Sequence, residues 1–422
     1  MLKALSNVFK VKELRKKVLF VLAMMAVYRL GAHIPVPAVD ASIIRERLFQ
    51  GGAGGAFEFL DLFAGGALRN FTIFAMSITP YITASIILNL LTVVIPKLEE
   101  LSKQGREGKK KIAQYTRYGA VLLAVIQGIG ITSYIRSFGA VENPNLFNLS
   151  LIVVSLTAGT AFLMWLGEQI NEKGIGNGIS IIIFTSIISR FPGDIYNTWR
   201  LLEAGSISVF NVLIFLVLAV LIIAGVIFVQ EGERRIPVQY SKRIVGRKVY
   251  GGRSTHIPMK VNQAGVIPVI FASSVLLFPG VIAQILPYQW AQNFADMIQP
   301  GTTLYMILYA LMILFFTYFY TAITFNPEEV AENMKKYGGF IPGIRPGKAT
   351  INYLDRILVR VTLAGAIFLT VVALLPFAIR PLTGVNINFG GTSLLIMTGV
   401  ALQTMQQIES HLLMRHYDGF ME

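Results

Sequence analysis

The spacing of long apolar runs is the strongest constraint on how this chain folds. A helix needs about 20 apolar residues to cross the hydrocarbon core of a bilayer. Ten runs of this kind are predicted, at 18–37, 71–95, 115–135, 149–168, 177–191, 208–229, 264–286, 302–325, 354–379 and 392–414. Only 14% of the 422 residues are charged, roughly half the share in a soluble domain. The sequence therefore predicts an all-α polytopic membrane protein with ten transmembrane helices.

Lysine and arginine are concentrated in alternate connections between these runs. They gather in the N-terminal tail 1–17, in the connection after the second run, and in the long segments 230–263 and 326–353. Basic connections face the cytoplasm in most membrane proteins. We therefore expect these segments, both termini and the short tail 415–422 on the cytoplasmic side. The net charge of +14 also favours contact with anionic lipid.

The runs divide into two sets of five. The N-terminal half is expected at 18–191 and the C-terminal half at 208–414, with an external hinge connection at 192–207. Because each half has an odd number of runs, the second half is inverted relative to the first, as in many transporters and channels.

Residues that perform chemistry are scarce in the runs. The chain has no cysteine, its four histidines lie at run ends or in loops, and no metalloprotease or serine-hydrolase motif occurs. Arg29 is the one clear charge inside a run, and it either pairs within the bundle or reaches toward an interface. We expect no enzymatic activity, no cofactor and no metal site.

A glycine-rich stretch, GGAGGAFEFLDLFAGGALRN, occupies residues 51–70. Its apolar part is too short to cross a bilayer, so it is predicted to be a re-entrant half-helix that folds back into a cavity. The alternative is a helix lying flat on the membrane. The half-helix spans 57–69 and includes Phe57, Phe59, Leu60, Leu62, Phe63, Gly65, Gly66, Leu68 and Arg69.

Several runs carry isoleucine next to residues that interrupt helices. Such isoleucines can form a hydrophobic constriction, although ordinary packing explains each one alone. The candidates are Ile78, Ile82, Ile183, Ile270 and Ile396. Polar side chains in other runs suit either helix-to-helix hydrogen bonds or a seam that opens to lipid. They are Asn89, Gln127, Asn262, Ser273 and Ser274.

The two long basic segments are candidate docking surfaces. Lysine and arginine interleaved with tyrosine suit a partner with phosphates or acidic patches, whereas orientation alone would explain the charge but not the length. The candidate contacts are Arg243, Arg247, Lys248, Arg345 and Lys348.

At these residues the whole chain resembles the SecY family, the central channel subunits of the bacterial Sec protein translocase. The matching stretches are RLGAHIPVP (29–37), LFAGGALRN (62–70), ITPYITASI (78–86), EGKKKIAQYTRYG (107–119), FLMWLGEQINEKGIGNGISIIIF (162–184), STHIPMKVNQAGVIPVIFASS (254–274), FYTAITFNPEEVAENMKKYGGFIPGIRPGKAT (319–350) and FGGTSLLIMTGV (389–400).

The resemblance implies a clamshell of two inverted five-helix halves in the cell membrane, with an hourglass pore. The five isoleucines would form the pore ring, segment 57–69 the plug, and the five polar residues a lateral gate between the second and third runs and the seventh and eighth. Unfolded secretory preproteins and signal peptides would be the substrates. The implied partners are SecE-like and SecG-like small membrane subunits, a SecA-type ATPase motor and the ribosome. The residues alone leave two alternatives, a secondary transporter for a small solute and a scaffold protein.

Overall fold

The fold is taken from a computed structural model of the whole chain. The structure describes residues 11–50, 60–137, 139–240, 243–245, 248–250, 254–285, 288, 290, 293–294, 297–383 and 391–418.

Each of the ten predicted runs coincides with a helix. In chain order they are α2 (Lys12–Gly31), α5 (Thr79–Val94), α7 (Gly105–Ser137), α8 (Leu146–Lys173), α9 (Gly178–Ile188), α11 (Val209–Glu231), α12 (Ile267–Ile285), α14 (Thr303–Thr324), α16 (Lys348–Thr383) and α17 (Gly391–Asp418). By length and apolarity, six described helices suffice to cross a membrane, or seven if the bent pair α5 and α6 (Pro96–Lys103) forms one span.

Several helix boundaries differ from the prediction; α7, for example, begins at Gly105 rather than 115. α2 begins at Lys12 and ends at Gly31, six residues earlier at each end than the predicted run and before Pro35 and Pro37. α5 begins at Thr79 rather than 71, with Pro80 in its first turn, where proline is tolerated. The residues before it, 65–78, form turns.

Shorter helices fill the connections. They are α3 (Ala41–Ile44), the π-helix η1 (Arg45–Gln50), α6, α10 (Phe191–Glu203) and α15 (Pro327–Lys336). α6 follows α5 at a bend of 100°. α10 occupies most of the segment 192–207, the predicted external hinge connection.

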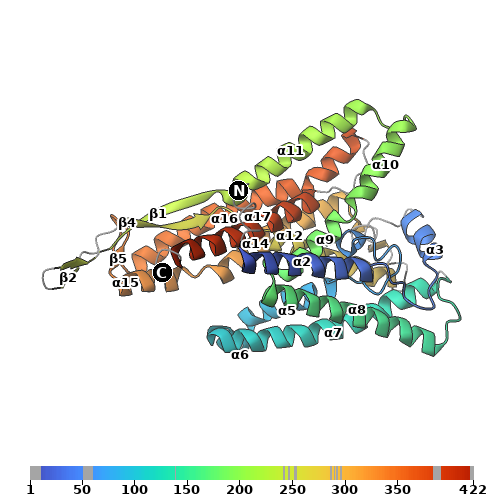
Figure 1. Cartoon of the computed structure of the whole chain (residues 1–422), viewed down its shortest axis with the longest axis horizontal. Helices are drawn as coiled ribbons and strands as arrows, with labels where there is room; N and C mark the ends of the chain where they lie inside the picture. Colours follow the sequence, from blue (N-terminus) through green and yellow to red (C-terminus); the bar gives the residue numbers. More distant parts are fainter. Residues whose placement is uncertain are drawn as a thin grey trace.

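The two long basic segments build a three-stranded sheet and a separate two-stranded sheet that the all-α prediction omitted. Segment 230–263 holds β1 (Glu233–Tyr240), β2 (Arg243–Val245), β3 (Lys248–Tyr250) and β4 (Ser254–Lys260), and segment 326–353 supplies β5 (Gly339–Phe340). β1 is the central strand, antiparallel to β4 and β5 on either side, while β2 pairs with β3. We call the sheet β4-β1-β5 together with α15 the loop module. It lies at one end of the molecule, at the left of Figure 1.

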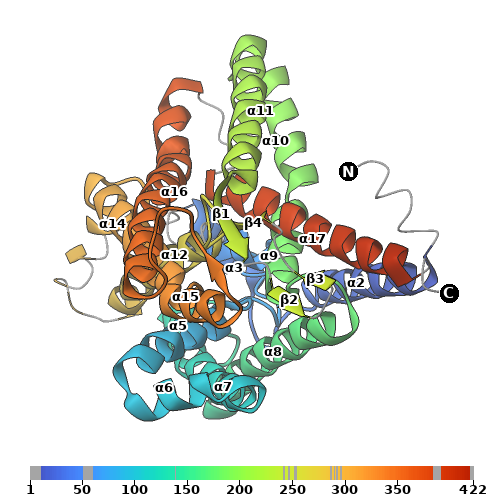
Figure 2. The same ribbon diagram turned by 90° about the vertical axis from the view of Figure 1, so that its left-hand side faces the viewer.

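The helices separate into two groups that follow the chain. In Figure 2, viewed from the loop-module end, α5, α7 and α8 lie on one side and α11, α14 and α16 on the other. Contacts between the groups come from α12, which packs against α5 and α7, and from α17, which packs against α9. The space enclosed by these cross-contacts contains the candidate site.

The buried core has three parts. The largest joins both helix groups, and a separate cluster around Ile236, Val238 and Leu354 holds the loop module against α16. In a third, small cluster, Leu14 at the start of α2 packs with Ile408 near the end of α17. The first and last described helices therefore reach the same side of the molecule.

Candidate functional site: an isoleucine neck with a plug

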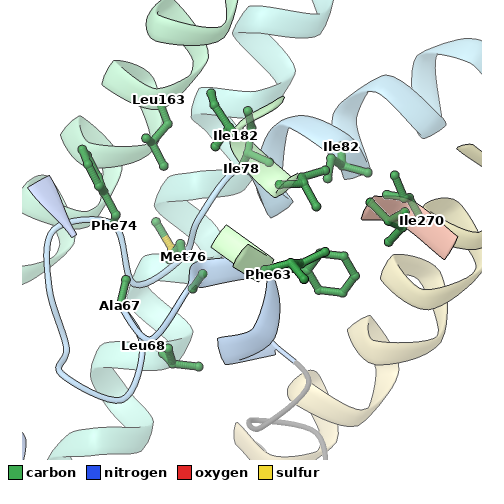
Figure 3. Close-up of a cluster of buried hydrophobic side chains, with 14 of the residues drawn as sticks. Phe63, Ala67, Leu68, Phe74, Met76, Ile78, Ile82, Leu163, Ile182 and Ile270 are labelled. Carbon is green, nitrogen blue, oxygen red and sulfur yellow. The ribbon is translucent and has the colours of Figure 1, made fainter. Parts of the chain in front are cut away.

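The five predicted isoleucines all lie in the buried core, and three of them, Ile82, Ile183 and Ile270, line one cavity. They come from four helices: Ile78 caps α5 and Ile82 lies within it, Ile183 is on α9, Ile270 on α12 and Ile396 on α17. All five are at most 5% exposed and belong to one hydrophobic cluster. Figure 3 shows Ile78, Ile82 and Ile270 within this cluster. We call the five residues the neck.

α9 shows what lies on each side of the neck. Asn177, which caps its first turn, lines a cavity, and Ile183 lies in the neck. Ser186 and Ser189, farther along, bond to Tyr28 and Arg29 of α2, which also bond to Ala64 and Gly65 of the predicted plug. At 1.5 Å per residue, the six residues from Asn177 to Ile183 rise about 9 Å. Along α9, Ile183 therefore lies between a residue that lines the cavity and the residues near the plug segment.

The cavity on one side of the neck has two connected parts. One, of about 230 Å³, is lined by Ile82, Ile183 and Ile270 of the neck together with side chains of α5, α9 and α14. The other, of about 220 Å³, reaches Lys260 at the end of β4, so it lies toward the loop module. Asn177, Ser180, Ile267 and Tyr320 line both parts. We call the whole cavity the vestibule.

The plug segment occupies the other side of the neck. Phe57 and Phe59 lie outside the described residues, and 60–64 are helical. Gly65 and Gly66 follow at φ +63° and +89°, a conformation that favours glycine and ends the helix. Leu62, Phe63 and Leu68 are buried, and Phe63 extends toward Ile82 and Ile270 (Figure 3). The predicted half-helix is thus a short helical turn followed by a compact loop.

Polar side chains from two helices fasten this loop. The Tyr28 hydroxyl lies 3.2 Å from the Ala64 carbonyl oxygen and 2.5 Å from the Ser186 hydroxyl. Arg29 Nη1 donates to the Gly65 carbonyl oxygen at 3.1 Å and to Ser189 Oγ at 3.2 Å. Arg29 therefore pairs within the bundle, the first of the two possibilities left open for it.

A buried ion pair adds a further attachment. Arg190, directly after Ser189, places Nη1 3.4 Å from Asp61 Oδ2, and the side chains are 10% and 1% exposed. Asp61 Oδ1 accepts hydrogen bonds from the backbone N–H groups of Leu68 and Arg69. Burial raises the pKa of the Asp61 carboxyl, although the Arg190 charge and these two donors oppose the rise. Asp61 therefore stabilises both the internal shape of the plug loop and its contact with the end of α9.

The predicted gate residues are spread over several surfaces. Asn89 lines the vestibule beside the neck, and Asn262 lines its second part. Ser273 and Ser274 are buried on α12, while Gln127 is half-buried on α7. Because α12 contacts α5 and α7 across the two groups, the seam between the halves runs along α12.

The docking candidates lie at the loop-module end. Arg345 and Lys348 are exposed where the segment after β5 leads into α16. Arg243 lies in β2 and Lys248 in β3, and Arg247 is outside the described residues.

Two features of the site were missed by the sequence analysis. One is the Asp61–Arg190 pair, whose members are far apart in the chain and look like ordinary loop charges. The other is a set of amide side chains on the vestibule wall, Gln230, Gln263, Gln403 and Gln406. Gln230 and Gln263 lie next to run ends and resemble interfacial residues, which is a weak signal, whereas Gln403 and Gln406 lie inside the last run. Within the described residues, no group of three or more potential metal ligands occurs.

The sequence of the chain is similar to a known protein family. The SecY family model matches residues 72–405. The protein translocase subunits SecY of Streptomyces scabiei and Halalkalibacterium halodurans are 49% and 50% identical to this chain, with both sequences covered completely. The subunit of Thermotoga maritima is 46% identical over 100% of this chain and 98% of its own.

Solved structures share the fold. A structure described as a protein conducting channel has a TM-score of 0.68 at 19% identity, covering 94% of this chain and 92% of its own. A SecY structure concerned with the plug domain, the closed state and the membrane seal has a TM-score of 0.67 at 17% identity and the same coverage. Sec61 from a canine ribosome–channel complex has a TM-score of 0.64 at 17% identity, again with coverage of 94% and 92%. Because the SecY family model matches most of the chain, relatives about half identical cover it completely, and solved structures share its fold, the chain belongs to the SecY family of protein translocase subunits.

Proposed function

We propose that this chain, as the channel subunit of a protein translocase, passes unfolded polypeptides from the vestibule through the neck. The observation that carries the proposal is that five isoleucines from four helices are buried in one cluster with Phe63 of the fastened loop, and that three of them line a cavity. Aliphatic side chains contact a passing chain of any sequence, because dispersion attraction requires no specific partner. No catalytic step is assigned to the chain itself.

Closure of the empty channel rests on the neck and the plug together. A narrow apolar constriction resists water and ions by dewetting. The plug loop covers it from the far side, with Phe63 in the same cluster as the neck. Opening therefore requires that the plug loop leave its contacts with α2 and α9.

The seam along α12 is the proposed lateral gate. Separation of α12 from α5 and α7 would open the neck toward lipid without unfolding either helix group. A segment of about 20 apolar residues would then leave the neck because burial of apolar surface in lipid gains roughly 25 cal/mol per Å². Asn89, Gln127, Asn262, Ser273 and Ser274 remain the proposed polar residues near this route.

The loop module is the proposed docking surface for the partner that supplies energy. Arg345 and Lys348, exposed beside it, together with Arg243, Arg247 and Lys248, suit either an ATPase motor of the SecA type or a ribosome, the partner of the Sec61 relative. This assignment places the loop module and both termini in the cytoplasm and the chain in the cell membrane. The apolar outer surface of the helices would be covered by SecE-like and SecG-like subunits and by anionic lipid.

Crosslinking through introduced cysteines tests the proposal, and the cysteine-free chain makes the background clean. Ile270→Cys, in the membrane complex with the motor, would be combined with a single cysteine at successive positions of an arrested secretory chain. We expect adducts whose yield follows the arrested position. If the arrested chain is engaged and Ile270→Cys gives no adduct, the polypeptide pathway does not run through the neck. The solute transporter is then the leading alternative.

A further inference from the structure

The side chains that line the vestibule change from amides at the loop-module end to isoleucines at the plug end. On α5, Asn89 and Ser85 line the vestibule, and Ile82 follows toward the plug. On α17, Gln406, Gln403 and Gly399 line it, and Ile396 follows. Spacings of three and four residues place each series on one helix face. α9 repeats the change in the opposite chain direction, through Asn177, Ser180 and Ile183.

The polar part of the vestibule is nearly neutral. Among the described residues, Lys260 is the one charged residue in its lining, and Lys260 Nζ already donates to Gln406 Oε1 at 3.1 Å. Charged walls would retain segments of opposite charge and repel those of like charge. Amides carry donors and acceptors without net charge, so they form hydrogen bonds with groups of either kind.

Three of these amides have unpaired polar atoms. Asn262 is 5% exposed, and its Nδ2 donates to the Gly265 carbonyl at 2.9 Å, but its Oδ1 has no partner. Gln263 Oε1 and Gln230 Nε2 are also buried without a partner. Buried polar groups are normally paired, so unpaired ones need an explanation. The set includes two acceptors and one donor, which are the complements of a peptide N–H and a peptide C=O.

We propose that the amides of the vestibule form a binding site for the main chain of an extended polypeptide, independent of its sequence. The inference rests on the proposed pathway through the neck, and it adds that hydrogen bonds to peptide groups hold the chain just before the apolar constriction. Every peptide presents the same N–H and C=O groups, proline excepted. The amides thus contact the backbone of any sequence, as the isoleucines contact its side chains. Bonds of modest net strength let the chain advance from one amide to the next.

The test measures how long an arrested chain stays in the channel. A preprotein is arrested in the motor-driven complex, the energy source is removed, and backward sliding is followed by protection from protease. The double variant Gln263→Met and Gln403→Met keeps side-chain length but removes hydrogen bonding. We expect sliding two- to tenfold faster, the range for losing about one net hydrogen bond. Gln114→Met, an exposed position on α7 outside the vestibule, is the matched control.

The chemistry of the arrested segment separates the explanations. A Gly/Ser segment keeps its N–H groups, whereas a Pro-rich segment of equal length lacks many of them. The inference predicts faster sliding of the Pro-rich segment in the unaltered channel and little further change in the double variant. Equal acceleration of both segments by the variant would overturn it, and so would an unchanged rate. Adducts at Ile270→Cys, measured in parallel, report the pathway, so loss of those adducts marks failure of the proposed function instead.

Discussion

The neck depends on the apolar character of individual side chains, and Ile183 tests this most directly. Ile183→Asn would place an amide in a ring that is at most 5% exposed. Because the amide attracts water, we expect the empty channel to leak ions, while polypeptide passage continues. Conductance of the purified complex in planar bilayers measures the leak.

Ile188→Asn is the matched control for this substitution. Ile188 ends the same helix but is 37% exposed and lies outside the neck. It makes the same chemical change and should leave the conductance at its basal level. Equal leakage from both variants would show that α9 is generally disturbed and that the neck is not the seal.

The Asp61–Arg190 pair makes a second prediction about single residues. Asp61→Asn retains an oxygen that accepts from Leu68 and Arg69 but removes the ion-pair partner of the buried Arg190. Loss of one partner from a buried pair costs about 3–5 kcal/mol. We therefore expect the plug loop to leave the neck more often, measured as a higher open probability in bilayer recordings.

The double variant Asp61→Asn with Arg190→Gln distinguishes lost charge balance from lost shape. It removes both charges, so the open probability should fall back toward the basal value. Lys103→Gln, in a pair whose side chains are 72% and 48% exposed, serves as a surface control and should change nothing, since exposed pairs contribute little. A double variant as open as the single one would contradict the ion-pair explanation.

Elements were more predictable than their contacts. Each apolar run became a helix because composition and length decide that outcome in a bilayer. The loop module was missed although β1 alternates buried Ile236 and Val238 with exposed neighbours, because its charges dominated the interpretation of that segment. Asn89 and Asn262 were named from the sequence, but their place in one cavity with the four glutamines could not be predicted, and neither could the Asp61–Arg190 pair. Each unites residues separated by long stretches of chain.

Packing between α8 and α9 yields a prediction at the scale of elements. A Cβ on Gly178 would lie 1.9 Å from the Gly167 carbonyl oxygen, so the two helices must move apart in Gly178→Ala. Overpacking typically costs about 1–3 kcal/mol, and we expect a lower Tm of the purified complex. Gly193→Ala, where a Cβ meets nothing within 4 Å, should leave Tm unchanged. A normal Tm for Gly178→Ala would mean that the helices tolerate separation.

The loop module makes a prediction about partner binding. Arg345→Glu reverses an exposed charge on the segment between β5 and α16 without touching the core around Val238. We expect weaker binding of an acidic or phosphate-bearing partner, with the loss largest at low ionic strength because salt screens surface charges. The measurement is the affinity of the motor for the complex in nanodiscs at low and high ionic strength. Arg136→Glu, at the far end of α7, is the control, and equal losses would contradict docking at the loop module.

At the scale of the molecule, passage of a polypeptide requires the two helix groups to separate, because the neck is built from both. Ile78, Ile82 and Ile183 come from the first group, and Ile270 and Ile396 from the second. The vestibule offers positions for a tether between the groups. Ser85 on α5 and Ile267 on α12 line the same 230 Å³ part, so a short bifunctional reagent can join cysteines placed there.

Joining Ser85→Cys to Ile267→Cys should block transport, and cleaving the reagent should restore it. The matched control joins Ile267→Cys to Tyr320→Cys, which line the same part of the vestibule but both belong to the second group. That tether adds similar bulk without connecting the groups, so transport should persist. Transport of a preprotein into vesicles measures both. If the tether between groups leaves transport intact, the neck widens by side-chain movement alone; if both tethers block equally, bulk in the vestibule is the cause, and separation of the groups is not required.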